Sequence, residues 1–240
     1  MSVATASPAP ARKFSSNPVV AFYQSSIGKK VVVAVTGICL MLFVLGHLLG
    51  NLQIYLGEEQ LNSYSQHLQD LGPLLWIVRI ALLAIVVTHI VSTIQLALQN
   101  RAAKPQKYVI KGYQRSTLAS RTMVISGLIV LCFIIFHLLH FTFQVVHPEF
   151  RNLHDAQGRH DVYHMMIAGF RRPLISFFYV LGLFLLANHV SHGFQSVTQT
   201  LGINNRKISG LISNCGRIFS WFVFIGFVSI PATILLGIVK

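Results

Sequence analysis

The sequence predicts an all-α integral membrane protein in which five helices form one transmembrane bundle. Hydrophobic residues make up 53% of the 240 residues and charged residues only 10%, and the mean hydropathy of +0.62 is too high for an ordinary water-soluble domain. Five apolar runs are each long enough to cross a hydrocarbon core, which takes about 20 residues at a rise of about 1.5 Å each. These runs are residues 31–54, 74–98, 122–146, 174–197 and 218–239.

The five runs leave no room for a separate water-soluble domain, so residues 22–240 are predicted to form a single transmembrane domain. Residues 1–21 are rich in Ala, Ser and Pro and have no apolar core, which argues against a cleavable signal and predicts a flexible tail. The three cysteines lie apart, within or beside apolar runs, and are interpreted as packing residues: Cys39, Cys132 and Cys215.

The charges are sorted by loop, and this predicts the orientation of the bundle. Lys and Arg gather before the first run and in the second and fourth loops, whereas all six carboxylates fall in the first and third loops, where four arginines accompany them in the third. Because cytoplasmic loops carry an excess of Lys and Arg, the N-terminus is predicted to be cytoplasmic and the C-terminus external. The same rule accounts for the net charge of +13 without a nucleic-acid partner.

One histidine lies in each of the first four runs, at two matched depths. Counted along the helices, His47 and His137 lie near the external face, while His89 and His189 lie nearer the cytoplasmic face, about 10 Å away. An ionisable side chain at membrane depth is costly and usually faces a partner inside the bundle. Two neutral imidazoles at each level can supply both axial ligands of a haem held between facing helices.

Small residues near these histidines favour a haem, because a flat tetrapyrrole needs clearance; they are Gly46, Gly50, Ser92, Ala187 and Gly193. A second histidine follows two of the candidates after three residues and shares nearly the same helix face. His140 therefore competes with His137 as a ligand, and His192 competes with His189. The member of each pair that is not a ligand is a candidate partner for a haem propionate, and His140 also for a quinone.

Other uses of intramembrane histidines fit less well. Zinc or di-iron chemistry is disfavoured because no Asp or Glu lies inside any apolar run, whereas di-iron bundles need several carboxylate ligands. Isolated histidines could simply hydrogen-bond across helices, or relay protons in a haem-free transporter. Four histidines at matched depths favour the haem interpretation over both.

Several motifs, in order, resemble one known family. They are the stretch from Ser25 to Leu52 ending in GHLLGNL, LNSYSQHLQDLGPLLW (61–76), KGYQRSTLASRTMVISG (111–127), FHLLHFT (136–142), and NHVSHGFQS (188–196) followed by QTLG. From about residue 22 to residue 230 the chain resembles the five-helix, dihaem cytochrome b membrane-anchor subunit of succinate dehydrogenase and fumarate reductase, the succinate:quinone oxidoreductases.

The resemblance implies that His47 and His137 bind the distal haem and that His89 and His189 bind the proximal one, which is the pairing that the depth count gives. It favours His137 over His140 and His189 over His192. It implies two haem b groups, a quinone substrate, expected to be menaquinone, and a flavoprotein and an iron-sulfur protein bound on the cytoplasmic side. It places the complex in the inner (cytoplasmic) membrane, with a dimer as one possible assembly.

The dicarboxylate chemistry is expected to belong to the partner subunits, because the chain has neither a dinucleotide fingerprint nor a cysteine cluster for iron-sulfur ligation. Asp70 and His67, in the external loop before the second run, are candidates for a quinone site, and Arg79 for a propionate partner. No glutamate stands next to His189, where some fumarate reductases of the family have one, and this favours a succinate-oxidising or direction-neutral enzyme over one with compensating proton transfer. The alternative function is the cytochrome b subunit of a hydrogenase or formate dehydrogenase.

Overall fold

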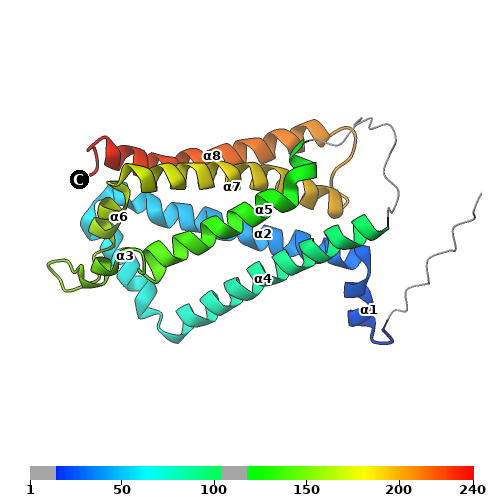
Figure 1. The fold of residues 1–240 in the computed structure, drawn as a ribbon, viewed down its shortest axis with the longest axis horizontal. Coiled ribbons are helices and arrows are strands. Elements are labelled where there is room, and N and C mark those ends of the chain that lie inside the picture. Colours follow the sequence, from blue (N-terminus) through cyan, green and yellow to red (C-terminus); the bar gives the residue numbers. More distant parts are fainter. Residues whose placement is uncertain (1–14, 104–117) are drawn as a thin grey trace, which may run out of the picture.

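The computed structural model describes residues 15–103 and 118–240, without the side chains of 118–121, and it shows five long helices side by side (Figure 1). Each is long and apolar enough to span a membrane. In a hydrocarbon core a helix satisfies every backbone N–H and C=O internally, which is why these apolar runs are helical. The predicted all-α fold with five spans is thus confirmed, and its helices are α2 (Ser26–Asn51), α4 (Pro73–Ala102), α5 (Leu118–His137), α7 (Pro173–Thr200) and α8 (Ser209–Leu235).

The helix ends differ from the apolar runs where polar residues continue a helix. α8 begins at Ser209, well before the predicted start at residue 218, because the polar stretch SGLISNCGR is helical without being apolar. It ends at Leu235, shortly before Gly237, whose φ of 69° is the left-handed conformation that commonly ends a helix. α5 passes into a π-helical turn, η2 (Leu138–Thr142), instead of continuing to residue 146.

A short helix, α1 (Pro18–Gln24), meets α2 at a sharp corner (Figure 1). Nζ of Lys29, a buried side chain, donates to the carbonyls of Tyr23 at 2.9 Å and Gln24 at 3.1 Å. The Tyr23 hydroxyl donates to Oε1 of Gln95 on α4 at 3.0 Å, which fixes α1 against the bundle. α1 therefore includes the last residues of the segment predicted to be a tail.

α2 is the central helix of the bundle, since it packs against α4, α7 and α8 (Figure 1). α7 packs against α5 and α8. The contact between α5 and α7 is especially close, because a Cβ at Gly182 would collide with the ring of Phe133. α4 is the least enclosed of the five spans, and Ser92 is its one buried residue.

The end of the bundle that carries α3 (Glu58–Asp70) and α6 (Val162–Phe170) is here called the capped end. These two helices lie in the first and third loops, together with the 3-10 turns η1 (Leu52–Leu56) and η3 (Pro148–Asn152). A cluster of buried apolar side chains joins the cap to α7 and α8: Ile54, Leu61, Met166, Ile167, Phe170, Tyr179, Ile230, Ile234 and Val239. The tightest apolar packing is therefore at one end of the bundle.

A buried polar network holds α3 to the third loop. Asn62, which is fully buried, donates from Nδ2 to Oδ1 of Asp161 at 3.1 Å, and its Oδ1 accepts from the backbone N–H of Tyr163 at 3.0 Å. Asp161 caps α6 by accepting from the backbone N–H of His164 at 3.0 Å. Arg159 reaches across with a bond to Glu59 at 2.6 Å and another to Asp155 at 2.7 Å. The two loops thus form one folded cap.

The stability of this cap should fall in acid because of Asp161. Burial raises the pKa of Asp161, but hydrogen bonds from His164 and Asn62 outweigh it and hold the pKa below the ordinary value of about 4. The unfolded chain therefore takes up this proton at a higher pH than the folded chain. The stability is complete above about pH 5 and is lost as the pH falls through the folded pKa.

Thermal unfolding measured from about pH 6 to about pH 3 tests this expectation. The midpoint should fall with pH, and Asp161→Asn, which has no carboxyl to titrate, should flatten the fall. An unchanged pH profile in that variant would show that Asp161 does not set the acid sensitivity.

Candidate functional site

The structure brings His47 of α2 and His137 of α5 together, and they are called the distal pair below. Their ring centroids are 5.8 Å apart and their planes are nearly perpendicular, at 80°. Two metal–imidazole bonds of about 2 Å each would place two ring centres roughly 6 Å apart. The observed spacing therefore suits two imidazoles that share one metal ion between them.

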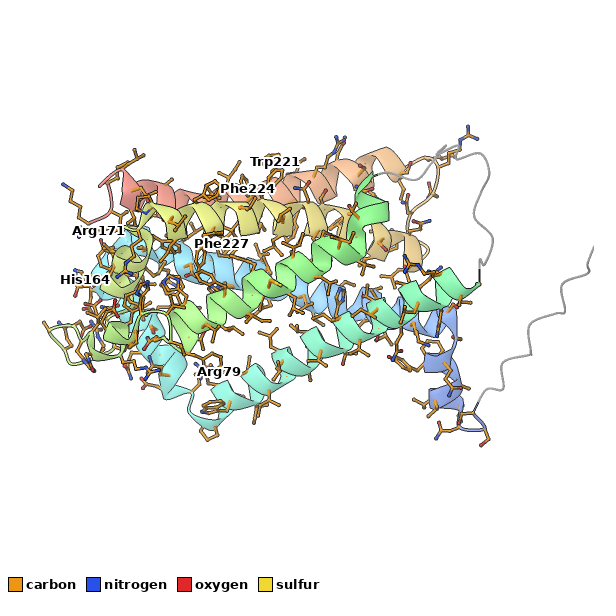
Figure 2. The ribbon with its side chains drawn as sticks, viewed as in Figure 1. Arg79, His164, Arg171, Trp221, Phe224 and Phe227 are labelled. Atoms are coloured by element: carbon orange, nitrogen blue, oxygen red, sulfur yellow. The ribbon has the colours of Figure 1, made fainter. Side chains whose placement is uncertain are left out.

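Aromatic rings surround the distal pair. Phe43 stacks on His47 at 5.5 Å, and Phe227 from α8 approaches the same ring at 5.8 Å (Figure 2). Phe133 and Phe141 lie 6.4 and 5.9 Å from the ring of His137. Such an apolar setting favours neutral imidazoles and a large apolar ligand over a hydrated ion.

His89 of α4 and His189 of α7 are the other two candidate ligands, and they are called the proximal pair below. Nδ1 of His89 lies 3.0 Å from Oγ1 of Thr36, and Nδ1 of His189 lies 3.3 Å from Oγ of Ser126. Both hydroxyls come from helices that carry the distal pair, α2 and α5.

The two pairs lie at different levels of the bundle. Thr36, beside the proximal pair, precedes His47 of the distal pair by 11 residues on α2, and Ser126 precedes His137 by the same number on α5. Eleven residues make about three helical turns and a rise of about 16 Å, so each helix presents one face to both levels. His47 and His137 lie in direct contact, whereas the assignment of all four histidines to two haem-binding pairs stays a prediction.

His137 and His140, the two candidate ligands of this segment, differ in how accessible their side chains are. His140 is fully buried, with Nδ1 2.9 Å from the hydroxyl of Tyr179, and its ring contacts Phe141 and His147. His137 is partly accessible and faces His47. His137 therefore faces a histidine of another helix, whereas His140 is enclosed at the capped end.

Several other predicted site residues lie apart from the pairs. His67 on α3 is exposed, with Nδ1 2.7 Å from the carbonyl of Ser63. Asp70 accepts from Nε2 of Gln66 at 2.8 Å. Arg79 is exposed near the capped end of α4 (Figure 2), where its guanidinium lies over the ring of Trp76 at 5.1 Å. His192 lies one turn after His189 and interacts with it electrostatically. Their roles toward a quinone or a propionate stay predictions.

Two of the small residues expected to provide clearance serve in packing instead. A Cβ at Gly50 would lie 2.8 Å from the hydroxyl of Tyr64, so this glycine admits the tyrosine from α3. Ser92 is buried against the hydroxyl of Tyr23, 3.2 Å away. A Cβ at Gly46, beside His47, would meet nothing within 4 Å. The glycines in contact with the imidazoles of the proximal pair are Gly37 and Gly127, which the depth argument did not find.

His147 also differs from expectation. Histidines in loops are usually solvated, but the side chain of His147 is buried, with Nδ1 3.1 Å from Oε1 of Glu149. Nε2 atoms of both His140 and His147 are buried without a hydrogen-bond partner within the described residues. The third loop folds over these rings through η3, which the sequence pattern did not predict.

The donor set fits haem. Each level offers two imidazoles from different helices, the distal pair has the spacing of two ligands on one metal, and the proximal rings pack on glycines. Among the described residues, the cluster Glu58, Asp161 and His164 could also approach a metal ion, but it lies in the cap, and Asp161 and His164 already bond to each other there. The fold and these residues define a helical membrane protein with two pairs of histidines inside its bundle.

The family follows from comparison with known proteins. The family model for the succinate dehydrogenase/fumarate reductase transmembrane subunit matches residues 97–224, more than half of the chain. The chain therefore belongs to this family of membrane subunits. No curated protein and no solved structure matches it. The match includes α5 and α7 with His137 and His189, while the other two candidate ligands precede it.

Proposed function

We propose that this chain is the membrane anchor and electron-transfer subunit of a succinate:quinone oxidoreductase and that it binds two b-type haems. Family membership makes it a membrane subunit of succinate dehydrogenase or fumarate reductase. The observation that supports two haems is the presence of two histidine pairs at two levels, one on α2 and α5 and the other on α4 and α7 beside hydroxyls of α2 and α5.

The four histidines would bind the iron atoms through their ring nitrogens. His47 and His137 would hold the distal haem, and His89 and His189 the proximal haem. Because α2 contributes to one level through His47 and to the other through Thr36, its rigid three turns keep the two levels at a constant spacing. Phe43 and Phe227 exclude water from the distal ring faces. When bound, two haems supply one-electron carriers across the membrane between an iron-sulfur protein and a quinone.

The orientation and partners follow from charge and topology. The positive-inside rule would place α1 on the cytoplasmic side and the capped end on the external side. The flavoprotein and iron-sulfur subunits would then bind at the α1 end of the bundle. The proximal pair lies nearer to this end than the distal pair does. Four of the basic residues of the second loop that could bind these subunits, Lys104, Lys107, Lys111 and Arg115, lie outside the described residues. The protein would reside in the cytoplasmic membrane, and the quinone, expected to be menaquinone, would react near the distal pair.

The family match favours this function over the cytochrome b subunit of a hydrogenase or formate dehydrogenase. A haem-free transporter would have no need of paired imidazoles at the spacing of a shared metal.

Co-expression with the flavoprotein and iron-sulfur subunits tests the proposal. Membranes should hold both partners and should reduce a menaquinone analogue with succinate, whereas cells that lack this chain should leave the partners in the soluble fraction. Partners that remain soluble in the presence of the folded chain would contradict the proposed function.

A further inference from the structure

The Nδ1 atoms of the proximal histidines have different hydrogen-bond partners from those of the distal histidines. Thr36 Oγ1 lies 3.0 Å from Nδ1 of His89, and Ser126 Oγ lies 3.3 Å from Nδ1 of His189. In both cases the hydroxyl belongs to a helix other than that of the histidine, and the contact crosses a helix–helix interface inside the membrane.

The proton of each hydroxyl already has an acceptor on its own helix. Thr36 Oγ1 donates to the carbonyl of Val32 at 2.7 Å, and Ser126 Oγ donates to the carbonyl of Met123 at 2.9 Å. A hydroxyl has one proton and two lone pairs, so an oxygen that donates to a carbonyl is left to accept from the imidazole. The contacts at His89 and His189 are therefore Nδ1–H donating to oxygen.

This direction fixes the tautomer of both rings. An imidazole with its proton on Nδ1 has a free lone pair on Nε2, which is the form that binds a metal through Nε2. Within the membrane there is no water to replace these acceptors, so the two hydroxyls matter more there than at a surface.

A glycine follows each hydroxyl residue and brings the imidazole ring close to the helix. A Cβ at Gly37 would lie 3.5 Å from Cε1 of His89, and one at Gly127 would lie 3.3 Å from Cε1 of His189. A methyl group would just touch the first ring and would press on the second. The hydroxyl and the glycine together set the position and the rotation of each ring.

The distal pair has no equivalent arrangement among the described residues. Nδ1 of His47 lies 3.4 Å from Nδ2 of Asn51, which is itself a donor. Nδ1 of His137 lies 3.4 Å from the hydroxyl of Tyr179, which is closer to His140, at 2.9 Å. Loss of the Thr36 and Ser126 hydroxyls should therefore affect one level of the bundle only.

We propose that Thr36 and Ser126 are positioning residues for the proximal haem, because each accepts a hydrogen bond from Nδ1–H of one of its two axial histidines. The inference rests on the proposed dihaem function. It also gives a physical meaning to the repeat in α2 and α5, where a hydroxyl residue and a glycine stand three turns before a distal ligand.

The test compares the midpoint potentials of the two haems in the purified complex, measured by spectroscopic redox titration. In Thr36→Val, Ser126→Ala and the double variant, one haem should shift to a higher potential while the other stays unchanged. The reason is that an imidazole without an acceptor on Nδ1 is a less basic ligand. The double variant should also bind that haem roughly 10 to 100-fold more weakly.

Two sets of controls separate positioning from packing. Thr36→Ser and Ser126→Thr keep the hydroxyls and should restore the natural potentials. Thr198→Val and Ser220→Ala remove hydroxyls that donate to carbonyls of α7 and α8 and should leave both potentials unchanged. The low-temperature electron paramagnetic resonance spectrum should report altered ligand rings at one haem alone.

Unchanged potentials in both single variants would overturn the inference, as would equal shifts at both haems or failure of the hydroxyl-retaining variants to restore them. If the double variant does not assemble, the single variants provide the test. A natural complex without a second haem would instead contradict the proposed function, so the two failures are distinguishable.

Discussion

Replacing His137 with alanine should remove one of the two b-type haems and lower succinate:quinone reductase activity by roughly 100-fold or more. Loss of a residue that hydrogen-bonds a metal ligand already lowers metal affinity or activity by about 10 to 100-fold. Loss of the ligand itself should lower them at least as much. Haem content per chain and the reduced-minus-oxidised spectrum of the purified complex measure the loss.

His140→Ala is the matched control, because His140 lies one turn further along the same segment. The ring of His137 faces that of His47 at 5.8 Å, whereas His140 is fully buried against Tyr179. The His140 variant should keep both haems, with a lower thermal stability. Loss of a haem from the His140 variant and its retention in the His137 variant would reverse the assignment.

Replacing Asn62 with alanine should lower the free energy of unfolding of the cap by on the order of 3 kcal/mol. Asn62 is fully buried, and its amide connects α3 to Asp161 and to the first turn of α6. The change leaves the buried N–H of Tyr163 without its acceptor and removes a donor from Asp161. Thermal unfolding of the complex in detergent measures the effect.

Gln66→Ala is the control for this prediction. Gln66 lies on the same helix, α3, and donates to Asp70 at 2.8 Å on an exposed surface. Its replacement should change stability by well under about 1 kcal/mol. Similar losses in both variants would show that the buried network does not stabilise the cap.

Most of the fold could be predicted from the sequence because membrane spans follow from length and hydropathy alone. The helix ends could not, since α8 begins at Ser209 in a polar stretch and α5 passes into a π-helical turn at Leu138. The folded cap was also missed. Its helices α3 and α6 depend on contacts between loops, such as Asn62 with Asp161, about which hydropathy says nothing.

The contact between His47 and His137 could be expected because each lies at a countable depth in a helix of known rise, while the assignment of the four histidines to haems stays a prediction. Their surroundings were harder to predict. Thr36 and Ser126 look like ordinary residues of an apolar run, and their role depends on which helix lies opposite. The signal was nevertheless present, as a hydroxyl residue followed by glycine 11 residues before His47 and again before His137. Comparison of the first and third spans would have found this internal repeat.

The number of haems per chain tests the account most directly. A pyridine haemochrome assay of the purified complex, normalised to the amount of this chain, should give two b-type haems per chain. A value of one would mean that one histidine pair binds no haem. A value of zero in a folded complex with its partners would contradict the assignment of these histidines to haem.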